Sequence, residues 1–173
     1  MSLIARLFGR DKDDHAVVRP LWQRTIALAR DPAWYAECGV SDTVAGRFDM
    51  VSAILSLAIM RMENSPSLKG DTALITEMFV DELDGQLREM GTNDVVVGKR
   101  MGRLVSVLGG RLGAYRAALK SPDRIKQMAE VVTRNISMVD NGSSSCIAEK
   151  LAALHDRLAA LDDATLMAAE GWQ

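Results

Sequence analysis

Residues 50–60 read Met-Val-Ser-Ala-Ile-Leu-Ser-Leu-Ala-Ile-Met, which is the longest nearly uncharged apolar run in the chain. A membrane-spanning helix needs about 20 apolar residues, so this run is too short to cross a bilayer. The Ser65-Pro66 pair then ends the helix, because a residue that precedes proline disfavours the α region. The pattern predicts a helix from about Thr43 to Met62 in a soluble protein.

The composition is that of a helical protein. The 173 residues include 22 Ala, 19 Leu and 10 Met against 22 Val plus Ile and 8 aromatics, a balance that favours helix over sheet. The length fits one domain, and short connections make neighbouring helices antiparallel. We therefore expect an all-α fold, a single-domain helical bundle of about six to eight helices with mostly antiparallel neighbours. Residues 1–14 are expected to be an N-terminal tail and residues 15–173 the helical domain.

Capping residues, prolines and glycines predict the other helix ends. Asp31 is a candidate cap with Pro32 in the first turn of a short helix, and Ser41 or Asp42 is a candidate cap for the helix with residues 50–60. The remaining helices are expected from Pro20; from between Ser67 and Thr72 to Gly91; from Val95 to Leu119, capped by Asn93 or Asp94; from Ser121-Pro122 to Val139; from Cys146 to Leu161; and after Asp162-Asp163.

Charge separates onto two neighbouring helices although the net charge is only −2. The helix after Thr72 is acidic. The next is basic, with Lys99, Arg100, Arg103 and Arg111 within about one third of its circumference. Two interpretations stay open: pairing between the two helices, or a docking patch for an anionic partner such as ribosomal RNA or an anionic membrane surface. The near-neutral total argues against a strongly basic nucleic-acid binder, and no DNA partner is expected.

The carboxylates of the acidic helix do not predict a catalytic or metal site. Arg88 follows Asp84 by four residues, the spacing of an ordinary ion pair on a helix surface. No histidine lies near Asp81 or Glu89 in the sequence to complete a metal-ligand set. Nucleophile, phosphate-loop and metal motifs do not occur in the sequence. We therefore expect no enzyme activity, no catalytic residue, no metal and no cofactor.

The leucines near the C-terminus and the methionines each have two interpretations. In the last long helix, five apolar residues step 4-3-4-3, which is the spacing of a two-heptad seam. These residues are Ile147, Leu151, Leu154, Leu158 and Leu161. The seam either closes the protein's own core or meets a partner helix. The ten Met residues either fill core gaps or form an adaptable apolar binding surface.

The cysteines and the N-terminus bear on the compartment. Cys38 and Cys146 do not make a disulfide framework or a zinc site, and we expect both to be small buried hydrophobic residues in a reduced compartment. Residues 1–10 lack the long apolar core and cleavage site of a signal peptide. The expected localisation is cytoplasmic, with a peripheral position at the inner membrane as a further option.

Two ordered segments resemble a known family. The first is residues 34–50, WYAECGVSDTVAGRFDM, and the second is residues 81–101, DELDGQLREMGTNDVVVGKRM, followed by Gly110-Arg111 and by residues 115–119. Together they resemble the ubiquinol–cytochrome c chaperone family, which contains the mitochondrial cytochrome b assembly factor and its alphaproteobacterial relatives. The family-like core spans residues 34–119.

The resemblance implies a non-enzymatic chaperone, or assembly factor, for the respiratory cytochrome bc1 complex. It would bind newly made cytochrome b or a partner subunit, with a small partner chaperone and the ribosome as further partners. The alternative is a membrane-surface or ribosome-docking adaptor with no bc1-specific role. The motif and basic-helix residues expected to contact partners are Asp42, Arg47, Asp81, Asp84, Arg88, Glu89, Lys99, Arg100, Arg103, Arg111 and Tyr115.

Some motif residues also have structural interpretations. Gly46 would allow a close helix approach, Gly91 would supply a left-handed helix end, and Arg47 would pair with a carboxylate. The sequence departs from the family's usual residues at Ile54, at Thr92-Asn93 and at Leu108-Gly109. These departures suggest that the client or partner has diverged.

Overall fold

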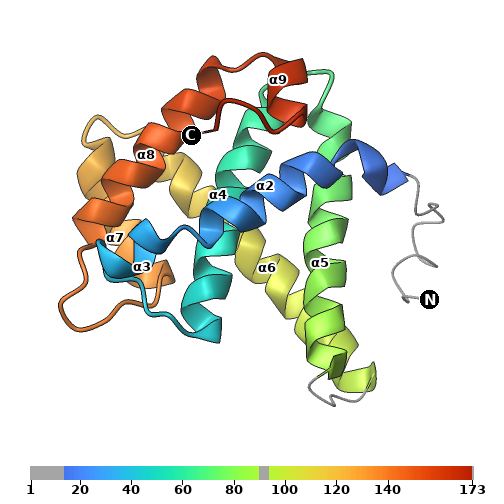
Figure 1. The fold of residues 1–173 in the computed structure, drawn as a ribbon, viewed down its shortest axis with the longest axis horizontal. Coiled ribbons are helices and arrows are strands. Elements are labelled where there is room, and N and C mark those ends of the chain that lie inside the picture. Colours follow the sequence, from blue (N-terminus) through green and yellow to red (C-terminus); the bar gives the residue numbers. More distant parts are fainter. Residues whose placement is uncertain (1–13, 90–93, 173) are drawn as a thin grey trace.

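The computed structural model describes residues 14–89 and 94–172, with side chains for all of these except 83–89, 94–101 and 104. Helices dominate the fold (Figure 1), and the predicted all-α bundle is confirmed. In chain order they are η1 (Asp14–Val17), α2 (Arg19–Ala29), α3 (Pro32–Ala36), α4 (Val44–Glu63), η2 (Lys69–Asp71), α5 (Thr72–Glu89), α6 (Asp94–Leu119), α7 (Arg124–Asn135), α8 (Ser144–Ala160) and α9 (Asp163–Met167). The predicted tail, except for Asp14, lies outside the described residues, as do Asn93, the expected cap of α6, and the expected helix end at Gly91.

Helix α4 lies at the centre of the bundle. Every residue from Ser52 to Met60 is buried, because α2, α6 and α8 all pack against α4. The hydroxyls of Ser52 and Ser56 donate to the carbonyl oxygens of Phe48 and Ser52, at 2.8 and 2.7 Å, so their burial leaves no orphaned donor. The apolar run is therefore a core helix, and no helix in the described ranges is long and apolar enough to cross a membrane.

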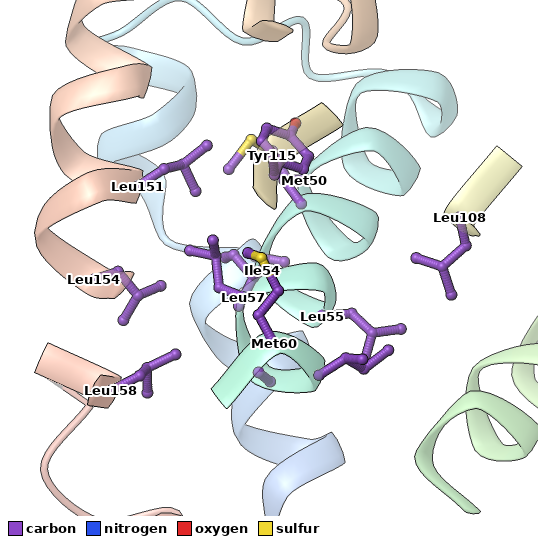
Figure 2. Close-up of a cluster of buried hydrophobic side chains, with 14 of the residues drawn as sticks. Met50, Ile54, Leu55, Leu57, Met60, Leu108, Tyr115, Leu151, Leu154 and Leu158 are labelled. Atoms are coloured by element: carbon purple, nitrogen blue, oxygen red, sulfur yellow. The ribbon is translucent and has the colours of Figure 1, made fainter. Parts of the chain in front are cut away.

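The leucine seam closes this core. Ile147, Leu151, Leu154 and Leu158 are buried, and Leu161 packs partly buried against the same cluster. Figure 2 shows three of these leucines in a row along α8, on the side that faces α4. The first of the two interpretations of the seam is thus the correct one in this structure.

Capping residues set the first turns of α3 and α4. Asp31 accepts a hydrogen bond from a first-turn N–H of α3 at 2.9 Å, with Pro32 as the first helical residue, as predicted. For α4 the predicted caps were wrong: Thr43, rather than Ser41 or Asp42, caps the helix. A short polar residue does cap the helix, as expected. Ser41, Asp42 and Thr43 are consecutive, and cap preference alone does not distinguish between them.

Helix α7 is shorter than predicted. It begins slightly later and ends at Asn135 rather than Val139. The residues after it run extended and pair with the connection between α3 and α4: the Ser41 N–H donates to the Ser137 oxygen and the Val139 N–H to the Gly39 oxygen, both at 2.9 Å. Backbone pairing with a distant segment therefore replaces the last helical turn.

The two paired connections approach each other closely at two glycines. Gly39 has φ +78°, and a Cβ on it would lie 2.5 Å from the Cα of Gly142. A Cβ on Gly142 would lie 2.8 Å from the Gly39 oxygen. No other residue fits this contact without moving the backbone. We call the paired segments, residues 38–41 and 137–146, the clasp.

A disulfide crosses the clasp. Cys38 and Cys146 are 108 residues apart in sequence, yet their Cα atoms lie 5.4 Å apart and the sulfurs are bonded. The expectation of two unlinked thiols was wrong. The cysteine content consequently no longer supports a reducing compartment, since disulfides persist in oxidising environments.

Asp163, at the start of α9, ties that helix to the end of α4. Arg61 donates from Nη2 to Asp163 at 2.9 Å and to the Leu161 carbonyl, at the end of α8, at 2.6 Å. Ser65 and Ser67 donate their hydroxyls to the other carboxylate oxygen of Asp163. The hydrogen bonds from Ser65, Ser67 and Arg61, in that order, lower the pKa of Asp163 from 3.8 to about 2.

Removing the disulfide should weaken the fold. We expect the double substitution Cys38→Ala and Cys146→Ala to lower the free energy of unfolding by about 2–5 kcal/mol, because the bridge closes a long loop in the unfolded chain. Urea denaturation with and without reductant measures this. Reductant should lower the urea midpoint of the wild type and leave the midpoint of the double variant unchanged. A wild-type midpoint that does not change with reductant would show that the disulfide is not formed.

The Asp163 contacts should give a defined acid response. A carboxyl group whose pKa is lowered by folding stabilises the folded state above its unfolded pKa, here 3.8, and loses this effect as the pH falls toward about 2. We expect the melting temperature of Asp163→Asn to lie below that of the wild type at neutral pH. The gap should close between about pH 4 and pH 2. Asp140→Asn, at an exposed carboxylate in the α7–α8 turn, is the control and should show no such closing gap in the same thermal melts.

Candidate functional site

A groove opens between α5 and α6 above α4. It encloses about 420 Å³ and its exposed lining is mostly apolar. Ile59 of α4, Val80 of α5 and Leu108 of α6 form its buried wall. The remaining lining residues are Glu63, Thr72, Ala73, Thr76, Glu77, Val105, Gly109 and Leu112.

The groove stays open because α6 carries small residues on this side. Gly109 lines it, and a Cβ on Gly109 would meet no atom within 4 Å. Val105, on the same face of α6, is 41% exposed, and Val107 is also exposed. Exposed β-branched residues beside an open apolar groove are typical of a surface that binds a partner.

An ion pair and a histidine–carboxylate hydrogen bond hold the rim of the groove. Glu63 of α4 pairs with Arg116 of α6. Glu77 of α5 lies 3.1 Å from His15 Nε2, so η1 is attached to the outside of α5. The carboxylates at the rim are therefore already partnered, and the free part of the groove is apolar.

Below the groove, a buried polar network fastens α6 to the rest of the fold. Arg111 Nη2 donates to Asp49 of α4 at 2.6 Å, and its guanidinium lies 5.3 Å from the ring centroid of Phe48. The other oxygen of Asp49 accepts from the backbone N–H and the hydroxyl of Ser137, at 2.9 and 2.8 Å. One carboxylate thus joins α4, α6 and the clasp.

Two expected partner-contacting residues lie inside this region. Arg111 was predicted to share an exposed basic arc, and that placement was wrong, because its side chain is paired with Asp49 and covered by neighbouring elements. Tyr115 is fully buried, and burial raises the pKa of its hydroxyl. Neither side chain offers a surface to a partner in this structure.

The Asp42–Arg47 pair lies at the surface near the start of α4. Arg47 Nε donates to Asp42 at 2.7 Å, and both side chains are 61% exposed. This hydrogen bond lowers the pKa of Asp42. Nearby, a Cβ on Gly46 would lie 2.0 Å from the Ser41 oxygen. Gly46 therefore allows a close approach, as predicted. The segment that approaches it is the connection before α4, however, and not another helix.

The remaining expected contact residues lie on the α5–α6 pair. Arg103 is exposed and Asp81 is partly buried. The side chains of Asp84, Arg88, Glu89, Lys99 and Arg100 lie outside the described residues. Helices α5 and α6 do pack against each other, so the acidic and basic helices are neighbours as the first interpretation required.

Among the described residues, no three His, Cys, Asp or Glu side chains gather in a way that could hold a metal ion. His155 lies beside Asp156 at 3.3 Å, far in the sequence from His15. The groove was not found by sequence reasoning. The departure at Leu108-Gly109 was the available signal, since it places a glycine in the groove wall.

Comparisons with known proteins agree with the resemblance seen in the sequence. The model of the family described as Ubiquinol-cytochrome C chaperone matches residues 36–171. The crystal structure of the Cbp3 homolog from Brucella abortus is 33% identical, with a TM-score of 0.78 over 96% of this chain and 94% of that chain. No curated protein matches the chain.

The buried network yields a stability prediction. We expect Arg111→Ala to lower the free energy of unfolding by about 3–5 kcal/mol, because it leaves the buried Asp49 carboxylate without its cation. Arg103→Ala, at an exposed position on the same helix, is the control and should change stability by less than about 0.5 kcal/mol. Urea denaturation of both variants measures the difference. Equal losses in the free energy of unfolding would show that Arg111 does not stabilise the buried Asp49 carboxylate.

Proposed function

This chain belongs to the ubiquinol-cytochrome C chaperone family, and from that premise we propose that it is a non-enzymatic assembly chaperone of the cytochrome bc1 complex. Its client is newly made cytochrome b, bound as an apolar helical segment. Family membership supports the chaperone role. The observation that carries the client site is the open apolar groove between α5 and α6.

The groove suits a helical apolar segment. In helix-in-groove recognition, an apolar helix face inserts a few side chains into a cleft between two helices. The volume of about 420 Å³ accommodates such side chains, and the wall of Ile59, Val80 and Leu108 supplies apolar contacts. A subunit of a membrane complex exposes apolar helices until it is inserted, so covering one of them is the chemistry that its chaperone must perform.

Val105 of α6 extends this site. It lines the groove and is 41% exposed. A bound segment would cover it together with the buried wall, and burying it contributes about 25 cal/mol per Å² of apolar area removed from water. Val107 is also exposed, but it lies about 200° further around the helix and faces away from the groove.

Contacts with further partners belong to the same proposal. Asp42 and Arg47 are exposed at the start of α4, where a small partner chaperone or the ribosome could engage them without opening the fold. Asp81, Asp84, Arg88, Glu89, Lys99, Arg100 and Arg103 on α5 and α6 stay proposed contacts. We propose that the protein acts in the cytoplasm, peripherally at the inner membrane, and that its Cys38–Cys146 disulfide persists there because Cys38 is buried away from reductants.

The second candidate is an adaptor that docks on a membrane surface or on the ribosome and has no bc1-specific role. The exposed Arg103 on the basic helix α6 is the observation that favours it. The two candidates differ in what loss of the protein does. An adaptor of this kind would leave cytochrome bc1 content unchanged when its gene is deleted.

A glycine pair in α6 tests the groove. Gly109 lines it and Gly110 does not, and a Cβ at either position would meet no atom within 4 Å. We expect Gly109→Phe to fill the groove and abolish client binding. Gly110→Phe is the matched control and should behave as wild type. Replacing glycine inside a helix costs no helix stability, so both variants should fold.

The readout is the content of cytochrome b and of assembled bc1 complex in a deletion strain that carries each variant. Wild type and Gly110→Phe should restore both, and Gly109→Phe should restore neither. Full restoration by Gly109→Phe would exclude the groove as the client site. Unchanged bc1 content in the deletion strain itself would exclude the bc1 role and favour the adaptor.

A further inference from the structure

A second, larger cavity lies away from the groove, between α2, α3 and α8. It encloses about 720 Å³ and shares no lining residue with the groove. The lining residues come from the end of α2, the start of α3, one side of α8 and the chain after α9. In Figure 1 these elements lie together on the side of the molecule opposite α5.

Four cationic side chains line this cavity against one carboxylate. Arg24 and Arg30 come from α2 and its C-terminal end, and Lys150 and Arg157 come from α8. The carboxylate is Asp31, which already caps α3. The cavity is therefore strongly positive for its size, although the whole chain has a net charge of −2.

Most of these cations have no anionic partner in the fold. Lys150 pairs with Glu37 at 2.7 Å. For Arg24, Arg30 and Arg157, no ion pair occurs with the part of the chain that the structure describes. Surface arginines often remain unpaired, but three that converge on one cavity are the usual arrangement for binding an anion.

Two tryptophans add apolar surface to the cavity. Trp172 is 0% exposed and its indole Nε1 is enclosed by protein, so this ring packs into the wall and presents no donor to a ligand. Trp34 also lines the cavity and donates its indole N–H to the Leu28 carbonyl at 2.8 Å. The polar groups that a ligand can reach are therefore the cationic side chains, of which Arg30 and Arg157 are exposed.

A chain reversal after α9 places Trp172 at the cavity. The backbone takes positive φ at Ala169, +62°, and at Gly171, +70°. These two left-handed residues turn the chain back toward α2. A non-glycine residue in this conformation is uncommon and costs free energy, so the packing of Trp172 compensates for it.

The geometry points to this cavity as a binding site for a phosphate ester, held through its phosphate group by Arg24, Arg30 and Arg157. The planar guanidinium group of arginine can donate two parallel hydrogen bonds to the oxygens of a phosphate. The cavity is larger than a phosphate ion. Trp34, Pro32 and Leu154 line the rest of it, so an organic portion of the ligand would contact apolar side chains.

Two sources of such a phosphate are a free phosphate ester and the headgroup of an anionic phospholipid. Titration calorimetry of the full chain with glycerol 3-phosphate and with inorganic phosphate tests the first. Co-sedimentation with phosphatidylglycerol vesicles, compared with phosphatidylcholine vesicles, tests the second. Binding in solution assigns a soluble ester, and binding to the anionic vesicles alone assigns a headgroup.

Two substitutions decide whether the cavity is responsible. Arg24→Gln and Arg157→Gln each remove one cation and keep a polar side chain. We expect each to weaken binding of whichever probe binds by about tenfold or more. Arg19→Gln, an exposed position on the same helix α2, is the matched control and should leave affinity unchanged.

Circular dichroism and thermal melts establish that the variants fold. Absence of binding to every probe by the folded wild type would overturn the proposal. So would equal affinity in wild type, Arg24→Gln and Arg157→Gln. Gly109 lines the groove and not this cavity, so Gly109→Phe should still bind the phosphate probe. Failure of the client-groove proposal would therefore leave this proposal untouched, and the reverse is also true.

Discussion

The buried carboxylate of Asp49 is the interaction on which the arrangement of the bundle depends. It lies on the central helix α4 and accepts hydrogen bonds from Arg111 of α6 and from Ser137 of the clasp. A buried charge is tolerated only when it is paired and hydrogen-bonded, so Asp49 constrains all three elements at once. Apolar packing brings the helices together without a direction, whereas these hydrogen bonds specify which side of α6 faces α4.

The clasp constrains the same end of α4 by further interactions. Its disulfide, its glycine contact and its backbone hydrogen bonds join the α3–α4 connection to the α7–α8 connection. Helices α4, α7 and α8 are therefore held by covalent, polar and apolar interactions together. Helix α6 is fixed in its C-terminal half by Arg111 and Arg116, while Val105 and Val107 are exposed. The molecule thus combines a cross-linked unit, made of α4, α7 and α8, with an exposed apolar surface on α6.

The two cavities suit different chemistry because different helices line them. The groove between α5 and α6 is apolar, and its rim carboxylates are paired within the fold. The cavity between α2 and α8 is positive, with three arginines that form no ion pair in the described part of the chain. An apolar segment and a phosphate group would therefore not compete for the same residues. The near-neutral total charge conceals both features, since it averages over surfaces of opposite character.

By itself, the sequence determined the helices, the central apolar run and the family. Helix starts such as Asp31-Pro32 depend on contacts within one turn, and the leucine seam of α8 depends on spacing along one helix, so both can be predicted locally. The end of α7, the pairing of Cys38 with Cys146 and the burial of Arg111 were decided by the tertiary structure. Each depends on a partner tens of residues away: Gly39 for the end of α7, the other cysteine, and Asp49. The same is true of both cavities, because a cavity is the space left between helices, and that space exists only once they have packed.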